Sequence, residues 1–124
     1  LYISLFPQLV AGPIVKYNEI HDQINKRHVT ISDFSDGIIR FIICLSKKVL
    51  IANVLGETAD AIFGLNSSGI DTPTAWIGII CYTFQIYYDF SGYSDMAIGL
   101  GKMFGFSFPE NFNYPYISKS VTEF

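Results

Sequence analysis

Residues 74–94 read TAWIGIICYTFQIYYDFSGYS and decide the fold class that the sequence predicts. Asp89 is the only formally charged residue in this stretch, and no Lys or Arg occurs between Lys48 and Lys102. A helix needs about 20 mainly apolar residues to cross the hydrocarbon core of a bilayer. We therefore expect a transmembrane helix over residues 74–93; the alternative is a buried helix of a large soluble protein.

The composition of the whole chain agrees with a membrane protein. Charged residues make up 15% of the 124 residues, against about 25% in an average soluble domain, and a small soluble domain has too much surface for so few charges. The net charge of −3 gives no basic patch, so no nucleic-acid partner is expected. Cys44 and Cys81 lie in apolar runs, which is typical of small buried hydrophobes, and we expect neither a disulfide nor a metal site.

The expected fold is all-α, a polytopic transmembrane helical bundle that forms a single partial domain over residues 1–124. Apolar runs and turn signals predict helices at about 1–10, 33–55, 74–93 and 95–105, with polar loops between them. Thr30 and Ser32 are both suitable N-caps for the second helix. The chain carries no initiator methionine or leader pattern, so we expect an internal fragment of a longer protein.

The expected helix at 33–55 has two different faces. Asp36 and Arg40 are four residues apart in the order that favours an ion pair within one helix. A cation facing lipid at the centre of a span costs about 2.5–3.5 kcal/mol. Either the polar face lines a cavity, or the helix lies at the membrane interface. The apolar stripe consists of Ile38, Ile42, Leu45, Val49 and Ala52, and the polar face of Asp33, Asp36, Arg40, Cys44 and Lys47.

Polar side chains within the apolar stretch are the candidate site. Gln85 and Asp89 are one helical turn apart, and Tyr88, Ser91 and Asp95 share a neighbouring face. An ionisable group inside a membrane span marks a polar path or site by default, although a carboxylate near the membrane surface would be inexpensive. The small residues Ala97, Gly101 and Gly105 recur every four positions, a pattern that favours close helix packing.

Several catalytic motifs fail. Residues 99–105 read GLGKMFG, which has the wrong spacing for a dinucleotide fingerprint and follows no expected strand. Residues 92–96 read GYSDM, where methionine replaces the second glycine of a nucleophile elbow. His21 and His28 lie in a polar stretch with no cysteine partner. None of these patterns predicts chemistry.

Residues 82–124, YTFQIYYDFSGYSDMAIGLGKMFGFSFPENFNYPYISKSVTEF, closely resemble a segment of the membrane-bound O-acyltransferase family. The segment is most similar to the bacterial branch that contains alginate O-acetyltransferases and the D-alanyl transfer protein of teichoic acid modification. FPQLVAGPI at 6–14 resembles the F-P-x-x-x-x-G-P-I turn of the family, and SKKVLIA at 46–52 resembles its K-K-V-L-I-A helix. The resemblance therefore extends over essentially the whole chain.

The resemblance implies a multi-pass protein of the cell membrane that transfers an acyl group, expected to be acetyl. The donor would be acetyl-CoA or an acyl-carrier protein on the cytoplasmic side, with no bound cofactor. The acceptor would be a hydroxyl group, for exopolysaccharide or cell-envelope modification. Expected partners are membrane lipid and an acyl carrier or a periplasmic or extracellular acyltransferase. The catalytic histidine of the family follows the position of Phe124, in a W-x-x-x-H context, so we expect no catalytic residue in this chain and no activity from it alone.

The helices of such a protein surround a narrow polar passage, and eight residues are our candidates for lining it. Two other classes remain open: a segment of a polytopic transporter or channel, and a non-catalytic scaffold of an export complex. A tryptophan followed four residues later by histidine, shortly after Phe124, would favour the acyltransferase. The candidate lining residues are Gln85, Tyr88, Asp89, Ser91, Asp95, Asn111, Asn113 and Tyr114.

Overall fold

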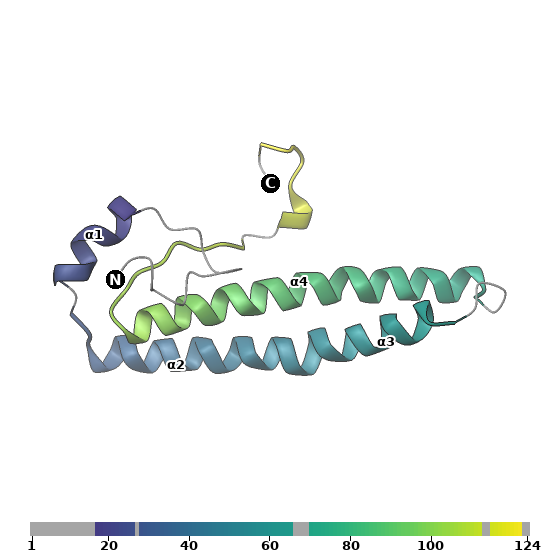
Figure 1. Ribbon diagram of the computed structural model, residues 1–124, viewed down its shortest axis with the longest axis horizontal. Helices are drawn as coiled ribbons and strands as arrows, with labels where there is room; N and C mark the ends of the chain where they lie inside the picture. Colours follow the sequence, from purple (N-terminus) through teal and green to yellow (C-terminus); the bar gives the residue numbers. More distant parts are fainter. Residues whose placement is uncertain (1–16, 27, 66–69, 113–114, 123–124) are drawn as a thin grey trace.

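The computed structural model describes residues 17–26, 28–65, 70–112 and 115–122, and over these it is all-α, as expected. Figure 1 shows two long rods that lie side by side, with a short helix and the C-terminal residues on one side of them. The predicted helix at 1–10 lies outside the described residues, as do residues 66–69 of the loop predicted between 55 and 74. The elements are α1 (Tyr17–Lys26), α2 (Ile31–Ser46), the π-helix η2 (Lys47–Ala52), α3 (Asn53–Phe63), α4 (Thr72–Met103) and the 3-10 turn η4 (Pro115–Ile117).

Two of the predicted helices are longer than the sequence indicated. The first rod consists of α2, η2 and α3, which follow one another without a break over residues 31–63, so the predicted helix at 33–55 continues into the predicted loop. The predicted helices at 74–93 and 95–105 are one helix, α4, of 32 residues, which at about 1.5 Å per residue is close to 50 Å long. The polar loop predicted between the helices at 1–10 and 33–55 contains α1 and the start of α2.

The ends of the long helices follow capping rules. Thr30 is the N-cap of α2, because its hydroxyl accepts from the backbone N–H of Asp33, and the Asp33 carboxylate accepts in return from the Thr30 N–H. Asp71 caps α4 in the same position. Of the two N-caps proposed for the second helix, the structure selects Thr30.

The C-terminal end of α4 corrects one prediction. Gly105 has a φ of 76°, the left-handed conformation that terminates helices. The N–H of Phe106 donates to the carbonyl of Gly101 at 2.8 Å, and the N–H of Gly105 donates to that of Lys102 at 3.1 Å. Gly105 therefore ends the helix instead of packing against a neighbouring one, and Gly101 makes room for a ring, that of Phe108.

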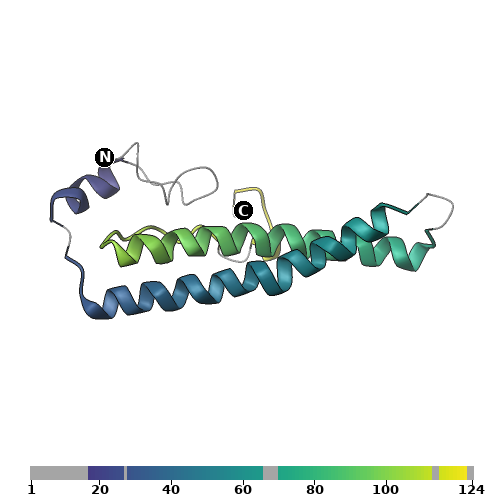
Figure 2. The ribbon, with the colours of Figure 1, turned by 60° about the horizontal axis from the view of Figure 1, so that its bottom comes forward.

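The two rods approach each other closely at a different pair of glycines. A Cβ built on Gly37 would lie 2.7 Å from the carbonyl oxygen of Gly99, and one on Gly99 would lie 2.9 Å from the carbonyl oxygen of Gly37. Both distances are shorter than a real Cβ contact allows. The two backbones meet directly here because neither residue carries a side chain. Figure 2 shows the rods running side by side over most of their length.

Small side chains continue this contact along the first rod. Gly37, Cys44, Ala52 and Ala59 are buried there, and we call the face that they turn toward α4 the seam. Their spacing is seven, then eight, then seven residues. The one longer step contains η2, because a π-helix inserts one extra residue into an α-helix. The π-turn thus keeps the small residues on one face.

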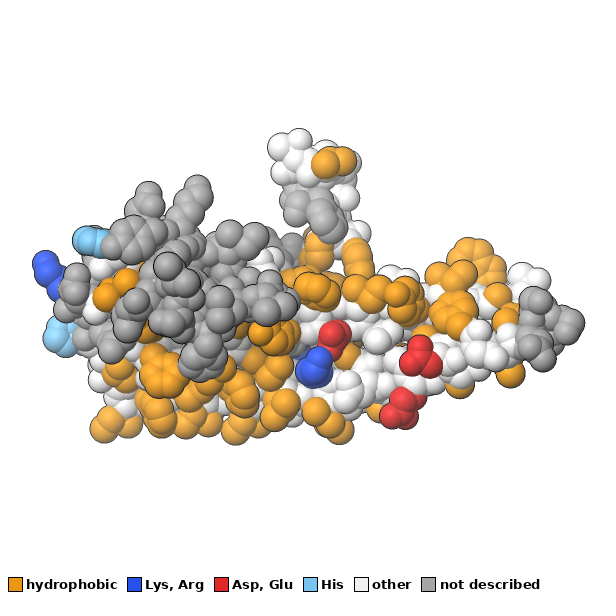
Figure 3. Space-filling model, in the orientation of Figure 1, with side chains coloured by type: hydrophobic (Ala, Val, Ile, Leu, Met, Phe, Trp, Pro, Cys, Tyr) orange, Lys and Arg blue, Asp and Glu red, His pale blue; other side chains and the backbone are white. Residues whose placement is uncertain are grey.

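The outer faces of both rods are apolar. Leu50 is 69% exposed and Trp76 is 61% exposed, and Figure 3 shows hydrophobic side chains over much of one face of the pair. Ile42, Leu45 and Val49 of the predicted apolar stripe are exposed, and only Ala52 is buried. Among the described helices, none meets the combined criteria of length and hydropathy for a membrane crossing. Residues 74–93 are helical as predicted, but this finding does not support their assignment as a span.

After α4 the chain reverses and runs back along that helix (Figure 1). We call residues 106–112 the return segment. Phe106 and Phe108 are buried in a small core with Ile20 of α1 and Ile98 of α4. Farther along, the ring of Phe112 lies 6.1 Å from that of Tyr87 between centroids. The return segment is therefore held against the same helix that precedes it.

Candidate functional site

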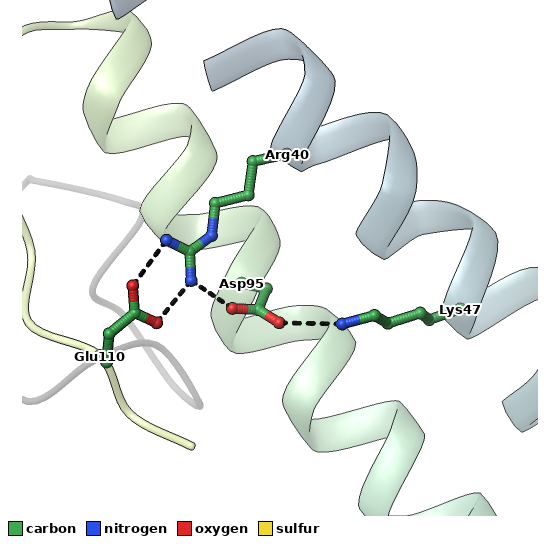
Figure 4. Close-up of polar contacts among 4 residues, drawn as sticks. All are labelled: Arg40, Lys47, Asp95 and Glu110. Carbon is green, nitrogen blue, oxygen red and sulfur yellow. Dashed lines mark hydrogen bonds and ion pairs between the residues drawn. The ribbon is translucent and has the colours of Figure 1, made fainter. Parts of the chain in front are cut away.

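The charged groups of the rods converge on Arg40 of α2. Its Nη1 and Nη2 atoms donate to the two carboxylate oxygens of Glu110 at 2.7 and 2.6 Å, and Nη2 also donates to Asp95 Oδ1 at 2.5 Å. The ammonium of Lys47 lies 3.4 Å from the other oxygen of Asp95. Figure 4 shows the four side chains in one row. One guanidinium thus joins α2, α4 and the return segment.

Burial and pairing set the electrostatics of this cluster. The side chain of Asp95 is 19% exposed and that of Arg40 is 30% exposed, so both charges are partly removed from solvent. The bidentate contact with Arg40 holds the pKa of Glu110 below its ordinary value. Charge-assisted, two-pronged bonds of this kind fix direction as well as distance. Each charged group of the cluster therefore forms an ion pair with another member of it.

Two further ion pairs cross between the rods. Lys48 of η2 pairs with Asp89 of α4, and Lys102 of α4 pairs with Asp36 of α2 at 2.9 Å. The predicted pair of Asp36 with Arg40 within one helix is wrong, because each of these residues reaches a partner outside α2. The partners lie in α4 and the return segment, which local spacing rules do not cover.

The polar face of α2 borders an open hollow of about 370 Å³. This agrees with the expectation that the face lines a cavity, one of the two interpretations of its charges. The lining contains charges of both signs together with the buried thiol of Cys44. Its residues are Asp36, Ile39, Arg40, Ile43, Cys44, Lys47 and Asp95.

A second hollow, of about 400 Å³, lies where the return segment leaves the end of α4. His28, Lys102 and Glu110 are among the side chains that line it, together with Phe106 and Phe108. Arg40 lines both hollows. The Arg40 cluster therefore borders both hollows, with Glu110 on one and Lys47 and Asp95 on the other.

Three of the candidate lining residues, Gln85, Asp89 and Asp95, each contact a different part of the first rod. Asp89 and Asp95 both reach cations of the first rod, and Ser91 is buried on α4. Gln85 packs against Gly56, and its Oε1 is buried without a hydrogen-bond partner in the part of the chain that the structure describes.

The other candidates lie apart from this group. The ring of Tyr88 lies against those of Phe84 and Tyr87, and Asn111 is exposed. Among the candidates within the described residues, only Asp95 lines either hollow. Asn113 and Tyr114 lie outside the described residues.

Three charged residues of the Arg40 cluster, and Lys48 of the neighbouring pair with Asp89, were not among the candidates. Arg40, Lys47 and Lys48 could have been added from the sequence, since cations in an apolar helix need a polar environment. Glu110 gives no such signal, because it lies 70 residues from Arg40 in the chain.

Comparison with known proteins gives consistent matches over the whole chain. The model of the membrane-bound O-acyltransferase family, MBOAT, matches residues 1–124. Over 123 residues the chain is 50% identical to the probable alginate O-acetylase AlgI of Pseudomonas aeruginosa. This alignment covers 99% of this chain and 23% of the relative. It is 41% identical over 128 residues to the peptidoglycan O-acetyltransferase of Helicobacter pylori, covering 100% of this chain and 24% of the relative.

A more distant relative is the teichoic acid D-alanyltransferase of Bacillus subtilis, which is 28% identical over 127 residues, 99% of this chain and 32% of the relative. The chain thus spans about a quarter to a third of the length of these relatives. No solved structure matches it. Since the family model covers every residue from 1 to 124, the chain belongs to the membrane-bound O-acyltransferase family.

Proposed function

We propose that the full-length gene product transfers an acetyl group from a cytoplasmic-side donor to hydroxyl groups of an extracellular or envelope polysaccharide. The observation that carries this proposal is the 50% identity to a probable alginate O-acetylase over 99% of the chain. The peptidoglycan O-acetyltransferase, at 41%, also acts on a glycan. The D-alanyltransferase is more distant, at 28%, which favours acetyl over alanyl as the transferred group.

The arrangement of side chains supports a location within the cell membrane, in a multi-pass protein. The described helices turn mainly apolar side chains outward, Glu57 and Asp60 of α3 excepted, and small or ion-paired ones toward each other. Ionisable groups in such proteins face the interior of the bundle and pair with one another. The outer faces of the two rods would then contact lipid or other helices of the full-length protein.

The division of labour between this segment and the rest of the protein is part of the proposal. A histidine beyond Phe124, which the family resemblance implies, would act as the base that activates the acceptor hydroxyl. This segment would supply the helices and the ion pairs that hold the active centre in place. The donor would be acetyl-CoA or an acyl-carrier protein, and a periplasmic or extracellular acyltransferase would be the partner that completes transfer to the polymer.

The test measures ester-linked acetate on the cell's polysaccharides. We expect deletion of the gene to abolish O-acetylation of one polymer, and the full-length gene to restore it, while a gene for residues 1–124 alone does not. Membrane vesicles that contain the full-length protein should transfer label from acetyl-CoA or an acetylated carrier. Unchanged esters in the deletion strain would contradict the proposal and favour a transporter or channel. Full restoration by a variant that lacks the downstream histidine would favour a scaffold.

A further inference from the structure

Within the described residues, contacts of three chemical kinds attach the return segment to the helices. Phe106, Phe108 and Phe112 supply apolar anchors. The side chain of Gln23 in α1 pairs with the backbone of Ser107, accepting from its N–H at 2.7 Å and donating to its carbonyl at 3.4 Å. Glu110 supplies the third kind through its two bonds to Arg40.

The attachment through Glu110 differs from the others because it fixes the orientation of the return segment as well as its distance from the helices. The guanidinium is planar, and its fork of donors matches a carboxylate only in one orientation. Since Nη2 of Arg40 bonds to Glu110 and Asp95 at once, the return segment takes its position from α2 and α4 together. An apolar anchor such as Phe108 restricts distance but leaves rotation less constrained.

We propose that Arg40 is a positioning residue of the acyl transfer: by holding Glu110 and Asp95 together, it sets where the chain beyond the return segment lies against the rods. The inference rests on the proposed function. The chain continues from Glu110 to η4, where the ring of Tyr116 lies 5.3 Å from that of Tyr87 on α4. A displacement of about 1 Å in a group that orients reactants lowers a rate by roughly a hundredfold.

Because the Glu110 side chain is exposed, its effect on the position of the return segment can be tested apart from the stability of the fold. Its side chain is 62% exposed, and exposed ion pairs contribute little to the stability of a fold. The apolar core around Phe106 and Phe108 does not depend on that carboxylate. Loss of the Glu110 charge should therefore loosen the return segment while leaving the protein folded.

The experiment uses the full-length protein in membranes or detergent with three substitutions. Glu110→Gln keeps the shape but removes the charge, Arg40→Lys keeps the charge but removes the fork, and Glu110→Asp is the conservative variant. Glu57→Gln, the same chemical change at an exposed position of α3, is the matched control. The readouts are hydrogen exchange of residues 106–112, kcat and KM for the acetyl donor, and the thermal midpoint.

We expect Glu110→Gln and Arg40→Lys to speed exchange of the return segment and to lower kcat about tenfold, with KM within twofold. The thermal midpoint should be unchanged in Glu110→Gln, because that carboxylate is exposed. Glu110→Asp should recover part of kcat, and Glu57→Gln should match wild type. Unchanged exchange in both variants overturns the inference, whether or not the wild type is active. Faster exchange with unchanged kcat also overturns it. A wild-type protein that transfers nothing refutes the proposed function, and the positioning role with it.

Discussion

Gly37→Ala should open the seam where the backbones of the two rods meet directly. The added methyl group would lie 2.7 Å from the backbone oxygen of Gly99 and 3.0 Å from the backbone nitrogen of Met103. Neither atom can move without moving α4. The two rods must therefore separate near this end, one turn before Arg40.

The magnitude follows from two opposing effects. Overpacking a close contact costs about 1–3 kcal/mol, while replacing glycine with alanine inside a helix gains about 1 kcal/mol. Because the obstacle at Gly37 is backbone, the cost should fall toward the upper end of its range. We expect a net loss of about 1–2 kcal/mol, which changes the ratio of open to closed forms by a factor of about 5–30.

Cys44 provides the assay, because its side chain is buried on the same face of α2, seven residues after Gly37. The full-length protein is labelled with a maleimide after Cys81 and any other cysteine have been replaced by serine. The labelling rate of Cys44 reports how often the seam opens. We expect the rate to rise about 5–30-fold in the Gly37→Ala variant, in proportion to the open form.

Gly56→Ala is the matched control. Its added methyl group would meet only the far end of the Gln85 side chain, at 3.1 Å, and that side chain can move. The gain in helix propensity should then dominate, so labelling of Cys44 should be unchanged or slower. If Gly37→Ala also labels no faster than wild type, the direct backbone contact at Gly37 and Gly99 is wrong.

Three further predictions concern the ion pairs and the end of α4. Asp89→Asn leaves the ammonium of Lys48 without its carboxylate partner. The variant should accumulate normally, but its acyl transfer in the full-length protein should fall about tenfold, which is equivalent to about 1.4 kcal/mol. Transfer at the wild-type rate would contradict this prediction. Gly105→Ala forces a side chain into the left-handed region and should destabilise the folded protein by about 1–2 kcal/mol, measured by thermal unfolding. The contact with Arg40 lowers the pKa of Glu110. The stability that this pair contributes is therefore fully present above the ordinary pKa of a glutamate, and it is lost as the pH falls through the lowered pKa of Glu110. Hydrogen exchange of residues 106–112, corrected for its intrinsic rate, should rise only between these two pKa values and below.

The class of fold and the existence of the long helices could be predicted from the sequence, but their ends could not. Thr30 was one of two suitable caps, and the structure uses it because Asp33 returns the hydrogen bond. Gly92 and Gly99 look like helix breakers in a sequence, yet both lie inside α4, where close contact with α2 requires the absence of a side chain. Tertiary packing therefore explains why α4 continues through Gly92 and Gly99, while the local turn at Gly105 ends it.

The candidate site was predictable only where the sequence shows an unusual charge. Asp89 and Asp95 stood out in an apolar stretch, and both form ion pairs between the rods. Their partners could not be assigned, because rules of local spacing match Asp36 with Arg40, four residues apart. The observed partners of Arg40 lie 55 and 70 residues away. Pairing over such distances depends on which faces of the helices meet.

The π-turn explains why those faces meet as they do. In an uninterrupted α-helix, the step of seven from Cys44 would bring Ile51 toward α4, where a large side chain would hold the rods apart. The extra residue of η2 brings Ala52 there instead, and Ile51 is 37% exposed. Within that same turn, neighbouring Lys47 and Lys48 both reach carboxylates of α4. Close packing and charge pairing thus both depend on one irregular turn. Together they offset the cost of interrupting the helix and hold both lysines against carboxylates of α4.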